Sequence, residues 1–334
     1  MSVVVIGVTE ARQLAHDVMT AVGVGEADAD AVADHVVEAE LRGHVGLARL
    51  TALVEHVARH GAGAGEPVVT PSSGPTALVD GAGRLGMVVG RIATDVAVAR
   101  AAEHGVALVA ATNHRYSGIL AYYVEHLVRT GLVAVAAASG SPVVAPYGGT
   151  EPRLSTNPLA LGFPVAEDDP VIHDFATSAI SGGELLRLAI TGGELPPDAA
   201  LDQQGRPTVS PQAASEGTLL TWGGHKGFGL SVSIQAFCLL AGMAPLPGPD
   251  EGWSLLLLAI DPGRVRPDID FPRRAAELVG LVRATAPLEP SQPVRVPFER
   301  SADERRRRLR DGIPVPEPLH AELRALSRRA PAAP

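Results

Sequence analysis

Two uninterrupted apolar segments limit the folds that this chain can adopt. Residues 106–111 read VALVAA and residues 132–138 read LVAVAAA, and the segment 118–130 between them has helical spacing of apolar residues. Continuous apolar runs are typical of strands covered on both faces, and strands that alternate with helices build α/β sheets. Because only 4% of the residues are aromatic, we expect an α/β protein with an aliphatic core.

Helices are predicted on both sides of this α/β segment. Apolar residues three and four positions apart predict helices over 10–23, 27–41 and 47–59, the first of them capped by Thr9. Further helices are predicted at 87–103, 228–240, 272–284, 301–310 and 316–328, and strands within the N-terminal 1–8 and near 68–70, 77–80, 159–163, 171–174, 253–260 and 293–297. Residues 143–215, rich in glycine and proline, are otherwise expected to form loops.

Composition argues against several classes of function. A net charge of −9 disfavours nucleic acid as a partner, and the basic run Arg305–Arg308 follows acids in a helix start, which is typical of a solvated helix face. No apolar run is long enough to cross a bilayer, and the N-terminus lacks a signal peptide's basic segment. Since the single cysteine, Cys238, cannot form an internal disulfide, we expect a cytoplasmic protein without a membrane partner.

Lys226 is the only lysine in a chain with 28 basic residues. It lies in WGGHKGFGL, residues 222–230, between glycines that let backbone approach a ligand closely. Lysine is a compact charge that arginine does not replace, and the helix predicted to follow would present its positive end to an anion. Lys226 is therefore either a ligand-binding residue or a solvated surface lysine.

The glycine-rich turn Gly81-Ala-Gly83-Arg-Leu-Gly86 follows a predicted strand and opens a helix, as in a dinucleotide-binding fingerprint. That fingerprint requires an acidic residue near the end of the next strand to bind the ribose hydroxyls. The next strand ends Val109-Ala-Ala-Thr112, without an acid. We therefore reject a Rossmann site at this turn.

Three polar stretches remain as ligand-binding candidates. Asn113-His114-Arg115-Tyr116 follows an apolar strand, where ligands of α/β sheets bind, and histidine is the side chain best suited to proton transfer near neutral pH. The other two are Ser155-Thr156-Asn157 and His173–Ser178, which contains Asp174. Helix capping and turn formation explain each stretch equally well.

Other catalytic fingerprints are missing from the sequence. There is no G-x-S-x-G, H-E-x-x-H or G-x-x-x-x-G-K-[ST] motif, and no group of His, Asp and Glu has the spacing of a metal site. The sequence therefore predicts no metal.

Taken in order, these stretches resemble the malate/L-lactate dehydrogenase type 2 family. The matching segments are AELRG at 39–43, Asn113-His114, APYGG at 145–149, TNPLA at 156–160, DFATS at 174–178, DQQGRPT at 202–208, GGHKGFGL at 223–230, AIDP at 259–262 and GIPVP at 312–316. Any one of them is weak evidence, but their shared order is specific.

The resemblance implies an α/β, non-Rossmann fold that binds NAD or NADP, usually in a homodimer. It implies three regions: an N-terminal helical region at 1–65, a cofactor-binding and catalytic α/β domain at 66–290, and a C-terminal strand and helices at 291–330 that pack back on the N-terminal region. It implies that His114 donates or accepts a proton and that Arg49 pairs with the carboxylate of an anionic substrate. Arg115 and Tyr116 replace smaller residues that are common in the family, and we expect them to help Arg49 bind the substrate. The implied cofactor-binding residues are Lys226, His225, Asp174, Phe175, Ala176, Thr156, Asn157, Gly140 and Ser141.

The chain departs from the family where a Ser-His-Gly segment normally precedes the arginine. Here residues 42–49 read RGHVGLAR, about two residues shorter, and Val45 takes the histidine's position unless His44 moves into it. On a helix, His44 would point nearly 100° away from that position. We nevertheless include His44 among the candidate catalytic residues.

We therefore predict an NAD(P)-dependent oxidoreductase that reduces a 2-oxo acid or a cyclic imine, or catalyses the reverse oxidation. The altered substrate side suggests an unusual substrate, as in secondary metabolism. Two alternatives stay open: a catalytically silent homologue that binds a ligand, and a non-redox enzyme, such as a cyclase or lyase, that reuses the scaffold.

Overall fold

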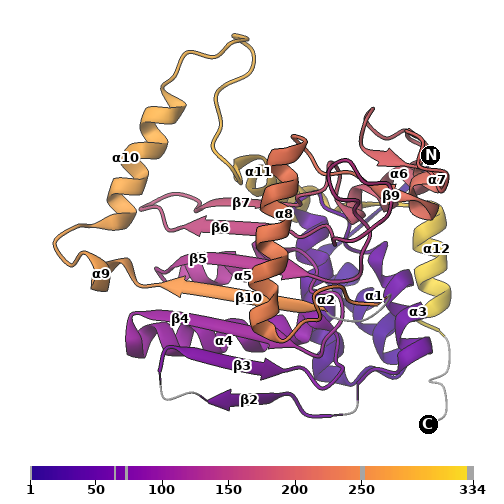
Figure 1. The fold of residues 1–334 in the computed structure, drawn as a ribbon, viewed down its shortest axis with the longest axis horizontal. Coiled ribbons are helices and arrows are strands. Elements are labelled where there is room, and N and C mark those ends of the chain that lie inside the picture. The colour runs from indigo at the N-terminus through magenta and orange to yellow at the C-terminus, as the bar shows by residue number, and fades with distance from the viewer. Residues whose placement is uncertain (1, 64, 72–73, 249–252, 329–334) are drawn as a thin grey trace.

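A mixed seven-stranded sheet forms the centre of the part of the chain that the computed structural model describes, residues 2–63, 65–71, 74–248 and 253–328. The strand order is β2-β3-β4-β10-β5-β6-β7, and only β3 and β4 pair in parallel (Figure 1). The strands are β2 (Val68–Pro71), β3 (Thr76–Asp80), β4 (Val106–Thr112), β5 (Val133–Ser139), β6 (Leu159–Phe163), β7 (Val171–Phe175) and β10 (Ser254–Ile260). The predicted α/β class is confirmed, in a sheet unlike the parallel sheet of a Rossmann domain.

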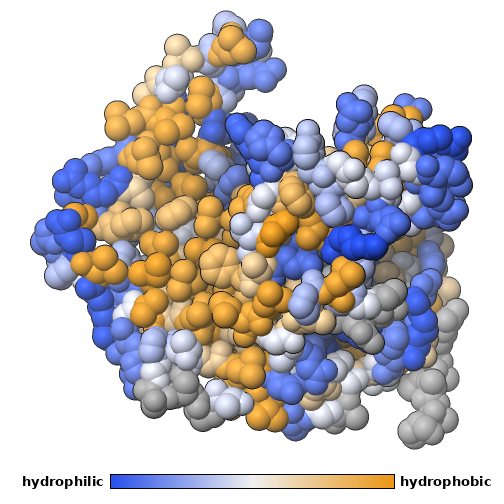
Figure 2. Space-filling model, in the orientation of Figure 1, coloured by the Kyte–Doolittle hydropathy of each residue, from blue (hydrophilic) through white to orange (hydrophobic). Residues whose placement is uncertain are grey.

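Two helices cover one face of this sheet, and a third crosses the other. α4 (Gly86–His104) and α5 (Leu120–Arg129) bury alanine, valine and leucine side chains of β4, β5 and β10. α8 (His225–Cys238) and the short 3-10 helix η1 (Leu239–Ala241) cross the opposite face. Because this crossing leaves part of the face uncovered, apolar side chains gather there at the surface (Figure 2).

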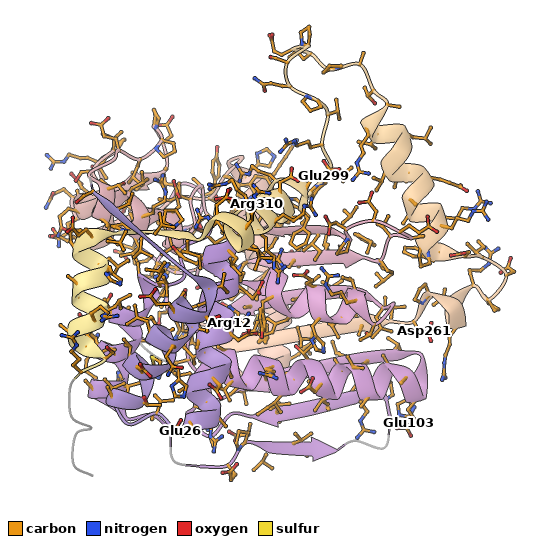
Figure 3. The ribbon with its side chains drawn as sticks, turned by 180° about the vertical axis from the view of Figure 1, so that it is seen from behind. Arg12, Glu26, Glu103, Asp261, Glu299 and Arg310 are labelled. Atoms are coloured by element: carbon orange, nitrogen blue, oxygen red, sulfur yellow. The ribbon has the colours of Figure 1, made fainter. Side chains whose placement is uncertain are left out.

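The N-terminal helices α1 (Val8–Ala21), α2 (Glu26–Leu41) and α3 (Arg49–His60) form a second core at one end of the sheet. The two ends of the chain meet there, because β1 (Val3–Ile6) pairs with β11 (Ile313–Pro316) and α12 (Glu317–Leu326) packs on α1. Figure 3 shows Arg12 at this helical end, whereas Glu103 and Asp261 lie at the opposite end of the sheet.

An arginine–glutamate network connects these layers. The buried carboxylate of Glu38 on α2 accepts hydrogen bonds from Arg305 on α11 (Glu299–Asp311), 2.8 Å from its Nε, and from Arg12. Arg42, at the end of α2, forms a buried ion pair with Glu125 of α5. The arginines at 305–308 all form ion pairs with acids of this chain, as expected of a helix face rather than a nucleic-acid patch.

Two sequence predictions about the fold are wrong. Thr9 does not cap α1, because the helix already begins at Val8 and its N-cap is Gly7. Residues 293–297 form no strand, and the C-terminal strand is instead β11, which finds a partner in β1. Within the described residues, no helix is long and apolar enough to cross a membrane.

Several short elements escaped prediction, although most other predicted elements are confirmed to within a few residues. Those missed are α6 (Gly182–Thr191), β8 (Ala200–Leu201), α7 (Pro211–Glu216), β9 (Thr218–Leu219) and α9 (Pro262–Val265), while α10 (Phe271–Arg283) was expected. α6 begins Gly182-Gly183, and α7 and α9 begin with proline. Glycine and proline in a short segment predict a turn, so these helices lacked a sequence signal.

Candidate active site

The polar stretches singled out in the sequence leave the sheet at the same edge. β4 ends at Thr112, and β10, its antiparallel neighbour, begins with Ser254, which lies opposite Ser139 at the end of β5. β6 begins with Leu159 opposite Phe175 at the end of β7. Figure 1 shows that this edge faces α2 and α3. The sheet therefore brings segments far apart in the sequence to one side of the molecule.

His114 follows β4 and lies against the glycine-rich turn that precedes α4. Methyl groups built on Gly81 and Gly86 would lie 3.1 Å from His114 Cβ and 2.7 Å from its Nδ1, respectively. Backbone hydrogen bonds join the two loops, from Gly83 N–H to the Asn113 carbonyl and from Arg115 N–H to the Arg84 carbonyl. The glycines therefore permit two loops to pack, a role that needs no dinucleotide.

The His114 imidazole is buried and neutral. Burial lowers its pKa to about 4, although the nearby Ala111 carbonyl raises it slightly, and the side chain is only 3% exposed. Neither ring nitrogen has a hydrogen-bond partner of normal geometry among the described residues. Buried polar atoms without partners are rare outside functional sites, so this imidazole is a candidate for proton transfer.

A second buried histidine supports the loop after His114. The Ile119 N–H donates a hydrogen bond of 2.9 Å to His35 Nε2, and burial lowers the pKa of His35 to about 3. Gly118 has φ +74°, and a methyl group on it would lie 2.1 Å from the same nitrogen. The loop is thus fixed from behind in a conformation that also places Tyr116 at φ +56°, an uncommon value for a residue with a side chain.

Arg49, the first residue of α3, lies beside this loop. Its guanidinium carbon is 5.3 Å from the centroid of the Tyr116 ring, within cation–π range. Methyl groups on Gly182 and Gly183, at the start of α6, would lie 3.4 and 3.6 Å from Arg49 Nη2. Arg49 has no ion-pair partner and its Nε has no hydrogen bond among the described residues, which leaves the guanidinium available to an anion.

The shortened turn before Arg49 is tightly packed. The buried Glu40 carboxylate accepts hydrogen bonds from the Gly46 and Leu47 N–H groups, at 2.9 and 3.4 Å. A methyl group on Gly46 would lie 1.8 Å from the Val36 carbonyl oxygen, so only glycine fits there. The turn is therefore a fixed part of the fold that places Val45, rather than a histidine, next to Gly183.

In the part of the chain that the structure describes, His44 has no hydrogen bond or ion pair with Arg49 or His114. Burial, followed by the charges of Arg300, Arg42 and Arg308, lowers its pKa, and two of these arginines, Arg300 and Arg308, belong to α11. Its neighbour Gly43 likewise faces Glu304 of α11. We do not carry His44 into the functional proposal.

A pocket of about 490 Å³ lies at the end of β7. The rings of His173 and Phe175 stack with centroids 4.4 Å apart, and Trp222 packs on Phe175 and donates a hydrogen bond of 2.9 Å to the Ala176 carbonyl. The pocket continues along residues 178–181. Because Gly182 follows directly and lies beside Arg49, this aromatic pocket adjoins the arginine site.

Lys226 and His225 are exposed residues of the first turn of α8, after Trp222. No side chain caps this helix, and although the Lys226 N–H already donates to the Gly223 carbonyl at 3.3 Å, the positive dipole end of the helix stays available. His225 packs edge-on against Tyr147, at a centroid distance of 6.3 Å. No hydrogen bond or ion pair connects Lys226 with His114 in the described part of the chain.

The other predicted cofactor residues fall into two groups. Gly140 is buried against Trp253, and Ser141 and Thr156 are partly exposed at the same sheet edge. Asn157 is fully buried, and its amide bonds to Ser231, Gln235 and Ser139 connect α8 with β5, so its side chain is occupied. In the described segments, no group of three or more His, Cys, Asp or Glu could hold a metal ion.

Asp174 lies on the opposite face of β7 from Phe175 and receives a hydrogen bond of 2.7 Å from the Ala121 N–H, at the start of α5. Burial raises its pKa from 3.8 to about 6, against the lowering effect of the Ala121 and Leu120 N–H groups. Since the fold favours the protonated carboxyl, the stability that Asp174 contributes is present below pH 4 and is lost as the pH rises through 6.

We expect Asp174→Asn to stabilise the protein above pH 6. The amide keeps an acceptor for the Ala121 N–H without a buried charge. Urea unfolding should show a free energy of unfolding higher than wild type by about 1–3 kcal/mol at pH 8, with a smaller difference at pH 4.5. A variant that is less stable than wild type at pH 8 would contradict this account of the carboxyl group.

Five residues of the site lacked a usable signal in the sequence. His173 and Trp222 stand out there only as members of longer motifs, and Gly182 and Gly183 of α6 lie in a segment whose composition predicts a loop. Trp253, at the start of β10, has its ring 6.0 Å from Tyr116. The two tryptophans are the only ones in the chain, and this scarcity is the one signal that could have identified them.

Comparisons with known proteins give consistent matches over nearly the whole chain. The Malate/L-lactate dehydrogenase family model matches residues 6–324. The L-sulfolactate dehydrogenase of Methanothermobacter thermautotrophicus is 32% identical, over 96% of this chain and 95% of its own. The Δ1-pyrroline-2-carboxylate/Δ1-piperideine-2-carboxylate reductase of Pseudomonas aeruginosa is 34% identical, over 95% of this chain and 97% of its own.

Solved structures show the same fold. A dehydrogenase from Sinorhizobium meliloti superposes with a TM-score of 0.89 at 32% identity, covering 98% of both chains. The matched region includes the N-terminal helices, the sheet and the C-terminal helices.

Proposed function

This chain belongs to the malate/L-lactate dehydrogenase family, and we propose that it transfers a hydride between NADH or NADPH and the carbonyl carbon of a 2-oxo acid or the imine carbon of a cyclic imine. One observation carries the proposal: an unpartnered imidazole, an unpaired arginine and an aromatic pocket lie around the same edge of one sheet. These groups can transfer a proton, bind an acidic substrate and stack on a flat cofactor ring.

In the proposed reaction Arg49 binds the substrate carboxylate, and Tyr116 supports the guanidinium from one side. In the direction of reduction the substrate carbon gains the hydride, and its oxygen or nitrogen gains a proton from the protonated His114, which is left neutral. The products are a 2-hydroxy acid or a cyclic amine and the oxidised nicotinamide. In the reverse direction the neutral His114, the form that its lowered pKa favours, accepts the proton.

The nicotinamide cofactor, when bound, supplies or accepts the hydride. Phe175 and Trp222 offer aromatic faces for one of its rings, and Lys226 with the start of α8 offers positive charge for a phosphate. His225, Ala176, Thr156, Gly140 and Ser141 complete the proposed cofactor side, whereas Asp174 and Asn157 contribute by fixing the backbone at the start of α5 and between β5 and α8.

Titration with NADH and with NADPH tests this proposal. We expect enhanced nicotinamide fluorescence and quenched tryptophan emission for at least one of them, because Trp222 is exposed in the pocket. Trp222→Leu should weaken binding about tenfold, in the range of a lost aromatic contact. Leu309→Ala, an exposed apolar change on α11, is the matched control and should leave binding unchanged.

The outcomes also separate the alternatives. Failure to bind either dinucleotide would contradict the proposal and favour a silent homologue. Turnover of a substrate without any added nicotinamide would favour a non-redox enzyme.

We also propose a homodimer, which the uncovered apolar face supports. Phe237, Leu240, Leu278 and Leu281 are each more than half exposed, on α8, η1 and α10 around this face (Figure 2). Monomeric proteins rarely expose such a patch. A solution mass near twice the chain's 34.5 kDa in sedimentation experiments is expected, and a monomer at all concentrations would contradict it.

A further inference from the structure

We infer that the pocket beside Arg49 selects substrates with a single negative charge and a flat or apolar body, over substrates with two negative charges. This inference rests on the proposed function and specifies its substrate class. It separates cyclic imine carboxylates and apolar 2-oxo acids from dicarboxylic and sulfonated 2-oxo acids.

Arg49 is the cation that this site offers to an anion. Its guanidinium has no acidic partner among the described residues, and its Nε is buried without a hydrogen bond. The other cation of the neighbouring loop, Arg115, already interacts within the protein, although its buried Nη1 has no hydrogen-bond partner among the described residues. One free guanidinium can neutralise one carboxylate in a bidentate pair.

Apart from the Ser181 hydroxyl, which already accepts a hydrogen bond from the Glu184 N–H at the start of α6, the neighbours that surround Arg49 are aromatic, apolar or without a side chain. The Tyr116 ring lies against the guanidinium, and Trp253 packs edge-on against Tyr116. Val45 and Arg49 both lie beside Gly183, where a methyl group would be 3.8 Å from Val45 Cβ and 3.6 Å from Arg49 Nη2. Tyr116 and Val45 also pack on the core of the N-terminal helices, so they are fixed in place.

This environment penalises a second charge. A second carboxylate or sulfonate would lose water against Val45 or the aromatic rings without gaining a cation, and an unpaired charge in such a site is costly. A flat ring or an aliphatic chain would instead gain contact with the same surfaces. Selection therefore arises from a penalty on dianions as much as from attraction of apolar groups.

The first test compares substrates on the wild-type enzyme by following nicotinamide absorbance. We expect kcat/KM for Δ1-piperideine-2-carboxylate or phenylpyruvate to exceed that for oxaloacetate and sulfopyruvate by at least about 100-fold. Equal or faster reduction of oxaloacetate or sulfopyruvate would overturn the inference while leaving the oxidoreductase function intact.

A binding measurement separates this inference from the proposed function. Calorimetry in the presence of oxidised cofactor should show that pyrrole-2-carboxylate, a flat monoanion, binds at least about tenfold more tightly than maleate, a dianion of similar size. If pyrrole-2-carboxylate binds in this way but no substrate turns over, the redox function fails and the selectivity stands. If maleate binds equally well, the selectivity fails.

Two variants test whether Val45 and Tyr116 set this selectivity. Val45→Arg adds a second cation, so the ratio of kcat/KM for monoanionic over dianionic substrates should fall about tenfold or more. Val69→Arg, the same change at an exposed position of β2, should leave this ratio unchanged. Tyr116→Leu should raise KM for the flat substrates about tenfold with a smaller change for oxaloacetate. If both Val45→Arg and Tyr116→Leu leave the preference unchanged, these residues do not set it.

Discussion

His114→Ala is expected to lower kcat by about 100- to 10,000-fold, the usual contribution of a general acid–base group. The imidazole is buried and has no hydrogen-bond partner of normal geometry among the described residues, so its removal breaks no such bond there while removing the group that exchanges the proton. Steady-state rates in both directions measure the effect, and cofactor fluorescence should show that dinucleotide binding persists.

His126→Ala is the matched control for that experiment. His126 lies on α5 with its side chain 56% exposed, so its removal should change kcat less than twofold. A His114→Ala enzyme that folds, binds cofactor and keeps a third or more of the wild-type rate would exclude His114 as the proton donor.

Arg49→Leu is expected to lower kcat/KM by about 1000-fold for any carboxylate substrate, because it removes the charge that the site offers to the acid. Arg49→Lys should recover about tenfold of this loss, since lysine restores the charge without the bidentate fork. Kinetics over a range of substrate concentrations should show the Leu effect mainly in KM.

Arg59→Leu provides the comparison on the same helix. Arg59 lies at the other end of α3 with its side chain 62% exposed, and we expect kcat/KM to change less than twofold. A loss below tenfold in Arg49→Leu would show that the substrate carboxylate binds elsewhere.

The shortened segment before Arg49 motivated the hypothesis of a silent homologue. The structure explains the short segment by hydrogen bonding and close packing. Glu40 holds the turn by two hydrogen bonds, and Gly46 fits against the Val36 carbonyl where no other residue would. A turn that is packed this closely delivers Arg49 to the site, so its shortness changes the pocket wall at Val45 without dismantling the site.

The elements with strong local patterns were predictable. The apolar runs of β4 and β5 and the helix between them identified the α/β class, and helical spacing located α2 and α3 to within two residues. The order of short motifs identified the family. These predictions succeeded because periodicity and composition depend on neighbours in the sequence.

The helix α6 and the strand β11 were missed for the opposite reason. α6 begins with two glycines and is stabilised where Leu186 and Ile190 pack on the core of the N-terminal helices. β11 exists because β1, more than 300 residues earlier, supplies its hydrogen bonds. Neither partner is visible in the local sequence.

The sequence by itself determined the fold class, the family and the residue types that carry the proposed chemistry, since local pattern and motif order suffice for these. Only the tertiary structure decided which of those residues meet. It placed Arg49 against Tyr116 and beside the α6 glycines, turned His44 toward the arginines of α11, and occupied the Asn157 amide in the core. Sheet register and close packing set these distances, and both depend on contacts between residues far apart in the chain.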